Sequence, residues 1–227
     1  MKEPALARRA ALAGVTSVVM LVVHSMILGS PPSNGSSETA VLRWLNGHHG
    51  VVLSSAWLDG IGSIVLVGTV YALVRLVGPE DGVTGRLATR MATIVVALSL
   101  VTDAALIAAT HAAGAGHGGP ATALFTFAYG IDFVFPLVNC LWLPAVGVLL
   151  LRSAVLPRGF GHAAVVVGVA EFVVGTAALF SSAAAAANNF VFIALLVWML
   201  AVSIVLAARA RVSPREIESA VVTPSLG

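Results

Sequence analysis

Six apolar stretches, each long enough to cross a lipid bilayer, determine what this chain can fold into. A helix needs about 20 mainly apolar residues to cross the hydrocarbon layer. Six windows meet this requirement: residues 10–29, 53–77, 91–112, 121–151, 160–180 and 189–208. Only 10% of the residues are charged, whereas soluble domains carry about 25%. The sequence therefore predicts an all-α integral membrane bundle of six transmembrane helices.

The basic residues are distributed unevenly between the two ends of these predicted spans. Eleven of the twelve lie on the same side of the membrane as the N-terminus: Lys2, Arg8, Arg9, Arg75, Arg86, Arg90, Arg152, Arg158, Arg209, Arg211 and Arg215. Arg43 is the one basic residue on the opposite side. Lys and Arg concentrate on the cytoplasmic side of membrane proteins. We therefore expect both termini in the cytoplasm and the protein in a bacterial plasma (inner) membrane.

This orientation divides the chain into a cytoplasmic N-terminus (1–9), a six-helix domain (10–208) and a disordered cytoplasmic tail (209–227). An alternative interpretation of the first span is a cleaved signal peptide, because Arg8 and Arg9 precede an apolar run. The length of that run and the absence of an A-x-A site favour a retained helix. Cleavage would leave the orientation of the other five spans unchanged.

Two segments between spans have a recognisable pattern. In SPPSNGSSETAVLRWLNGHHG, Ser36 or Ser37 can cap a short helix with Val41, Trp44 and Leu45 on one face. We expect this helix to lie at the outer membrane interface, where Trp is common. The run SSAAAAANN (181–189) is interpreted as an external turn or as a continuation of the fifth helix.

Several functional classes lack support in the sequence. Basic runs of the kind that bind nucleic acid are absent. Cys140 is the only cysteine, so an intramolecular disulfide and a CxxC motif are excluded. Phosphate-binding loops, dinucleotide fingerprints and HExxH motifs do not occur. We expect no cofactor and no nucleic-acid partner; the expected partners are the lipid bilayer and a small-molecule or lipophilic ligand.

Four acidic residues lie inside the predicted spans, one on each of the second to fifth helices: Asp59, Asp103, Asp132 and Glu171. A charge at the bilayer centre costs from about 2.5 to more than 10 kcal/mol. The four carboxyl groups should therefore face the protein interior. Counting along the helices places all four, together with His24 and His111, in the external half of the bundle.

The spacing of polar and small residues supports this inward orientation. Along the fourth span Phe125, Tyr129, Asp132, Pro136 and Asn139 follow three- and four-residue steps and so share one face. On the fifth span Glu171 lies in a stripe of small residues, which lets helices approach closely. That stripe consists of Gly161, Ala164, Gly168, Gly175 and Ala178. The expected ligand- or proton-binding set is Asp59, Asp103, Asp132, Glu171, His24, Tyr129 and Asn139.

Three functions are compatible with this cluster. A buried carboxyl group favours its neutral form and can exchange protons near neutral pH, which suits binding or movement of a small solute or protons. The same four acids are candidate catalytic groups of an intramembrane acid/base enzyme, a cyclase or isomerase acting on a lipophilic substrate such as an isoprenoid. Third, single polar residues can connect helices in a purely structural subunit.

A metal or haem site formed by His24 and His111 is a further alternative, although no ligand pair has metal-binding spacing. We therefore predict no metal ligands. Ligands that come singly from separate helices leave no spacing pattern in a sequence.

The segment LLLRSAVLPRGFGHAAVVVGVAEFVVGTAALF resembles uncharacterised multi-pass membrane proteins of actinobacteria that form a domain-of-unknown-function grouping. Leu156, Pro157 and Arg158 form the Leu-Pro-Arg turn that carries this resemblance, which extends over residues 130–227. It implies a topology and no activity. The segment ETAVLRWLNGHHGVVLSSAWLDGIGS is similar to membrane phosphatidic-acid phosphatases, but the three catalytic motifs of those enzymes do not occur here.

Overall fold

The structure, a computed structural model, describes residues 4–33, 35–78 and 82–211. This part of the chain is helical and contains no strand. The elements are α1 (Pro4–Leu28), α2 (Glu38–Gly47), α3 (His49–Val77), α4 (Val83–Gly114), α5 (Gly118–Ile131), α6 (Phe135–Arg152), α7 (Arg158–Ala178) and α8 (Ser182–Arg211). Six segments are long and apolar enough to cross a membrane, α5 and α6 together forming one of them. The prediction of a six-span membrane protein is confirmed.

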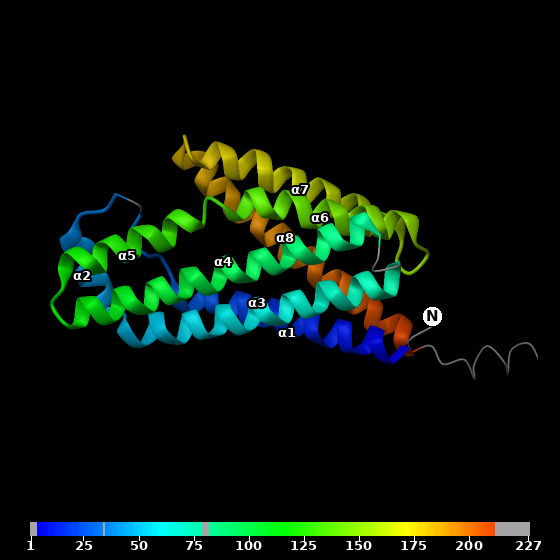
Figure 1. Ribbon diagram of the computed structural model, residues 1–227, viewed down its shortest axis with the longest axis horizontal. Helices are drawn as coiled ribbons and strands as arrows, with labels where there is room; N and C mark the ends of the chain where they lie inside the picture. The colour runs from blue at the N-terminus through cyan, green and yellow to red at the C-terminus, as the bar shows by residue number, and fades with distance from the viewer. Residues whose placement is uncertain (1–3, 34, 79–81, 212–227) are drawn as a thin grey trace, which may run out of the picture.

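The spanning helices run lengthwise along the molecule (Figure 1), and the contacts between them close into a ring. Contacts between neighbours follow the order α1, α3, α4, α6, α7, α8 and back to α1. This order places α4 opposite α8 and α3 opposite α7. Helices from the two halves of the chain therefore face each other across the interior, an arrangement that no single-helix pattern specifies.

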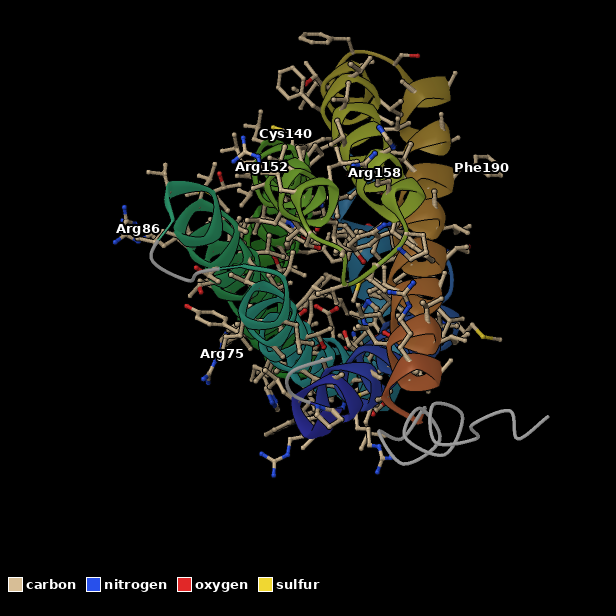
Figure 2. All side chains as sticks on the ribbon, turned by 90° about the vertical axis from the view of Figure 1, so that its right-hand side faces the viewer. Arg75, Arg86, Cys140, Arg152, Arg158 and Phe190 are labelled. Atoms are coloured by element: carbon tan, nitrogen blue, oxygen red, sulfur yellow. The ribbon has the colours of Figure 1, made fainter. Side chains whose placement is uncertain are left out.

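The arginines gather at one end of this ring, which we call the arginine end. Figure 2 looks onto it and shows Arg75, Arg86, Arg152 and Arg158 there. Two further arginines join helices at this end: Arg8 Nη2 donates to the carbonyl of Ala210 at 3.2 Å, and Arg209 donates to the carbonyl of Ala154 at 3.3 Å. The opposite end carries α2 (Figure 1), and we call it the α2 end.

Some predicted boundaries differ from the observed ones. Helix α1 begins at Pro4 rather than at residue 10, so part of the predicted N-terminal segment is helical. At the other end α8 continues to Arg211, three residues into the predicted tail. The rest of that tail, 212–227, lies outside the described residues. Helix boundaries depend on caps and neighbours as well as on hydropathy.

A large core fills the bundle towards the arginine end. Its fully buried members include Leu143, Val146 and Leu150 of α6 and Leu206 of α8, with Trp142 at its boundary with the α2 half. Because lipid is as apolar as these side chains, burial from water contributes little here, and close packing holds the helices together.

Helices α6 and α7 pack closely against each other. The predicted small-residue stripe of α7 is confirmed except at Ala178, which is only half-buried: Gly161, Ala164, Gly168, Glu171 and Gly175 are the buried residues of the helix. A side chain on Gly168 would collide with Pro144, and one on Gly175 with Pro136. The glycines thus accommodate the proline rings of α6, which explains why two prolines are tolerated inside one spanning segment.

The fourth predicted span is broken rather than merely bent. Residues 132–134 separate α5 from α6, and Pro136 occupies the first turn of α6. A proline ring excludes the carbonyl of the residue four positions earlier and has no N–H to bond it. The length of this span predicts tilt, a protruding end, or a kink at Pro136 or Pro144; the break lies next to Pro136 and places Asp132 at the end of α5.

Ser37 caps α2, as the sequence predicts, by accepting a hydrogen bond from the Ala40 amide. The face of α2 that carries Val41 and Leu45 is buried against α4 and α5. The apolar face is therefore covered by protein, because α4 and α5 present small alanines on which it can pack. This second core is named the α2 core.

Both interpretations of the alanine-rich run are wrong. Helix α7 ends at Ala178, and residues 182–189 form the first turns of α8. The amide of Ala184 lies 3.4 Å from Ser181 Oγ, so Ser181 caps the new helix. Alanine has the highest intrinsic helix propensity, which favours helix over turn.

Candidate functional site: an intramembrane carboxylate cavity

A cavity of about 390 Å³ lies inside the ring of helices. The residues of α1 that line it come from the second half of that helix, and those of α4 come mainly from the second half. Those of α3 and α8 come mainly from the first halves. The cavity is therefore displaced towards the α2 end. It is lined by all of the residues predicted to form the site: His24, Asp59, Asp103, Tyr129, Asp132, Asn139 and Glu171.

The depth of the cavity follows from helix geometry. Asp59 and Arg75 are separated by a rise of about 24 Å on α3. Asp103 lies about 20 Å from Arg90 on α4, and Glu171 about 20 Å from Arg158 on α7. Against a hydrocarbon layer of about 30 Å, the carboxyl groups lie in the third of the layer nearest the α2 end.

Three aspartates from different elements come together in this cavity. Asp103 interacts electrostatically with Asp59 and with Asp132, and Asp59 also interacts with Asp132. We call these three residues the aspartate cluster. Asp59 Oδ2 accepts a hydrogen bond from Ser99 Oγ at 2.6 Å, and Ser99 Oγ lies 2.9 Å from Ser63 Oγ. A hydrogen-bonded chain thus runs between α3 and α4 to the cavity.

Asp103 is the most enclosed member of the aspartate cluster, with 5% of its surface exposed. Its Oδ2 atom lies over Gly60, where an added Cβ would be only 3.2 Å away. In the described structure Oδ2 has no hydrogen-bond partner. A buried acceptor without a partner costs about 1–3 kcal/mol. This carboxyl group is therefore placed at a cost to stability.

Asp132 differs from the other acids because it is exposed. It lies in the break between α5 and α6 and still lines the cavity. The cavity consequently reaches the surface of the protein at Asp132. Phe125, which the sequence places on the same helix face, belongs instead to the α2 core and does not line the cavity.

Glu171 forms a separate polar group on the α7 side. It is 2% exposed, and the Asn139 side chain lies beside its carboxyl group. Trp142 Nε1 donates to Asn139 Oδ1 at 2.8 Å. That bond assigns the amide oxygen of Asn139 to Trp142 and leaves its NH₂ group free to face Glu171. Glu171 Oε1 has no hydrogen-bond partner among the described residues.

His24 lines the cavity and joins α1 to α3. Its Nδ1 atom lies 2.8 Å from Ser55 Oγ and 3.0 Å from the Ser55 carbonyl. His111 does not line the cavity; its ring contacts that of His49 with centroids 5.6 Å apart. The structure therefore does not bring His24 and His111 to one site, and the metal or haem alternative that pairs them is wrong.

The sequence interpretation missed several polar residues of the cavity. Asn188 and Asn189 line it from the start of α8, and Thr102 lines it from α4. Asn188 Oδ1, Thr102 Oγ1 and the Tyr129 hydroxyl are buried without a hydrogen-bond partner in the part of the chain that the structure describes. The sequence does contain an indication of these residues, because two adjacent asparagines precede the last apolar run. It was overlooked because the alanines before them were interpreted as a turn outside the membrane.

The remainder of the lining is apolar and lacks positive charge. No Lys or Arg occurs among the described residues that line the cavity. Much of the apolar lining consists of aromatic and aliphatic side chains of α6 and α8: Phe135, Trp142, Phe192, Leu195, Leu196 and Met199. The cavity thus combines carboxyl groups with a large apolar wall.

Comparison with protein-family models, with curated proteins and with solved structures finds no match for this chain.

Proposed function

We propose that this multi-pass membrane protein binds a small solute, with exchange of protons, at the carboxylates of its intramembrane cavity. The observation that carries the proposal is the pair of buried, unpartnered carboxyl oxygens that line the cavity, Asp103 Oδ2 and Glu171 Oε1. The arginine distribution supports cytoplasmic termini in a bacterial inner membrane, with the α2 end outside. Membership of the actinobacterial grouping that shares the Leu-Pro-Arg turn is part of the same proposal.

A purely structural role fits these observations less well. Polar side chains that only connect helices should have their hydrogen bonds satisfied by other helices. Asp59 and His24 meet this expectation, because they bond Ser99 and Ser55. Asp103 Oδ2 and Glu171 Oε1 do not, although Asn139 lies beside the Glu171 carboxyl group, and both residues line the cavity.

Labelling with dicyclohexylcarbodiimide tests the proposal. This apolar reagent enters hydrophobic sites and adds to protonated carboxyl groups. With purified full-length protein in nanodiscs, we expect adducts on Asp103 or Glu171 by peptide mass spectrometry. Glu38 is the internal control, because it is exposed on α2 and does not line the cavity.

The double variant Asp103→Asn/Glu171→Gln should lose these adducts while keeping its thermal unfolding temperature. Labelling that falls as the pH rises would show that the carboxyl groups exchange protons with solvent. If Asp103 and Glu171 stay unmodified at pH 5 to 8, the cavity is closed to small molecules and the structural alternative replaces the proposal.

A second candidate function is an intramembrane acid/base enzyme. The observation that favours it is the row of aromatic rings beside the acids, from Tyr129, Phe135, Trp142 and Phe192. Such rings can pack against a lipophilic substrate while a carboxyl group transfers a proton. Lipid extracts of cells producing the protein or its Asp103→Asn variant should then differ in one isoprenoid product. A gene position beside a prenyltransferase would favour this function over solute binding.

A further inference from the structure

We infer that the cavity binds a small organic amine, with its ammonium group at the aspartate cluster and a second hydrogen-bond donor at Glu171. This inference rests on the proposed function and names the chemical class of its solute. Three independent features carry it: the sign of the charge in the cavity, the kind of polar atom left without a partner, and the apolar wall between the two polar regions.

The charge of the lining selects cations. Asp59, Asp103 and Asp132 interact with one another, and the cavity residues include neither Lys nor Arg among those the structure describes. When two of these aspartates ionise, like charges repel each other at close range, and a bound cation relieves that repulsion. An anion would meet like charge without a compensating partner, which excludes it.

The orphaned atoms require hydrogen-bond donors. Asp103 Oδ2, Glu171 Oε1 and Asn188 Oδ1 are buried without partners among the described residues, and ionised carboxylate and amide oxygens are acceptors. Asp103 belongs to the aspartate cluster, whereas Glu171 has Asn139 beside it. A ligand with donors at both ends can satisfy both regions at once. An ammonium group offers three donors together with the required charge.

The apolar wall distinguishes an organic cation from a metal ion. Phe192, Leu195 and Met199 of α8 line the same cavity, and a hydrated ion gains nothing from such contacts. Among the described residues no group of three or more His, Cys, Asp and Glu side chains is arranged to hold a metal ion. The volume of about 390 Å³ lies at the lower end of the ligand-site range of about 300–1,000 Å³, which suits a short-chain amine.

Asp132 gives such a ligand its first contact. It is exposed and lines the cavity, so a cation reaching the break between α5 and α6 meets a carboxyl group before it reaches Asp103. Charge at an opening of this kind raises the rate of association with ligands of opposite sign.

Isothermal titration calorimetry with the full-length protein in nanodiscs tests the inference. The probes are 1,4-diaminobutane, butylamine, butane-1,4-diol, succinate and NaCl at matched ionic strength. We expect binding of both amines, with 1,4-diaminobutane at least about tenfold tighter because it also bonds Glu171. The diol, succinate and NaCl should give no binding heat.

Two variants test which carboxyl group binds which end of the ligand. Asp103→Asn should weaken both amines about tenfold or more. Glu171→Gln should weaken 1,4-diaminobutane and leave butylamine within about twofold, since butylamine has one donor group. Glu38→Gln is the matched control, because it removes an exposed carboxyl group outside the cavity, and its binding should equal that of the unchanged protein. Asp132→Asn replaces Asp103→Asn if the latter fails to fold.

Each opposing result overturns the inference. Butane-1,4-diol binding as tightly as 1,4-diaminobutane would show that charge is not recognised, and equal weakening of both amines by Glu171→Gln would remove the second donor site. If carbodiimide labels Asp103 or Glu171 but neither amine binds, the amine inference fails and the proposed function stands. If labelling also fails, both fail.

Discussion

The helices pack against one another differently in the two halves of the bundle. Towards the arginine end, Leu143, Leu150 and Leu206 are fully buried and small residues let α6 and α7 meet closely. Towards the α2 end, the same ring of helices encloses a cavity with buried polar atoms that lack partners. Packing is close around Leu143, Leu150 and Leu206, whereas towards the α2 end the cavity lies beside the well-packed α2 core.

This contrast indicates where the stability of the bundle resides. Helices in lipid associate through packing and interhelical hydrogen bonds, since the apolar driving force of water is absent. The arginine half supplies the packing, whereas Asp103 Oδ2 and Glu171 Oε1, which lack hydrogen-bond partners among the described residues, reduce stability in the α2 half. Sites in which buried polar groups lack hydrogen bonds are commonly functional sites. Their cost in stability is offset by interactions elsewhere in the structure.

The largest expected loss of stability comes from disrupting the contact between α6 and α7. Gly168→Leu places a side chain where Pro144 already lies, so α6 and α7 must separate. We expect a loss of about 3 kcal/mol, at the upper end for overpacked cores, measured as a lower free energy of unfolding in detergent. Gly68→Ala is the matched control, because nothing lies within 4 Å of an added Cβ there. Equal losses from both variants would contradict this account of the α6–α7 contact.

A matched pair of leucines compares the two halves directly. Leu150→Ala opens a void in the close core, and we expect a loss of about 2 kcal/mol from lost contacts. Leu196→Ala instead enlarges an existing cavity, which Leu196 lines, and should cost about half as much. Thermal unfolding of both variants in one detergent measures the difference. A larger loss for Leu196→Ala would place the tighter packing in the α2 half.

A smaller effect is expected at the cap of α2. Ser37→Ala removes the side-chain acceptor for the Ala40 amide and should destabilise α2 by about 1 kcal/mol. Because α2 packs on α4 and α5, hydrogen exchange should rise in α2 and at its contacts around Phe125. Exchange at Leu150 should stay unchanged. A rise at Leu150 would show that the two halves unfold together.

The smallest effect on stability is expected for Glu171→Gln. This change keeps the shape of the side chain and removes a buried ionisable group, so the unfolding temperature should stay the same or rise slightly. The same variant should lose binding of 1,4-diaminobutane. A loss of stability above about 1 kcal/mol would instead indicate a structural role for Glu171, since buried hydrogen bonds have that magnitude.

The sequence predicts those features that one helix determines alone. Hydropathy gives the six spans, three- and four-residue steps give the small-residue stripe of α7, and Pro136 gives the interruption in the fourth span. The cost of a lipid-facing charge gives the inward direction of Asp103 and Glu171, which are buried. Asp132 differs from this prediction, because it is exposed although it lines the cavity. All seven predicted site residues line one cavity, while their functional role stays a prediction.

Features that depend on neighbouring helices could not be obtained in this way. The order of helices around the ring decides that Asp59, Asp103 and Asp132 interact while His111 lies apart from His24. The burial of Val41 depends on the alanines of α4 and α5. Asn188 reaches the cavity because α8 begins earlier than its apolar run.

The depth of the carboxyl groups has an electrical consequence. A unit charge that crosses the whole membrane at 100 mV changes its energy by about 2.3 kcal/mol. A cation that enters from the α2 end reaches the carboxyl groups after about one third of the hydrocarbon layer, so the voltage contributes only about 0.8 kcal/mol to its binding. The remaining two thirds of the voltage drop falls across the close-packed arginine half. Occupancy of the cavity should therefore depend weakly on membrane potential, and passage through the bundle strongly.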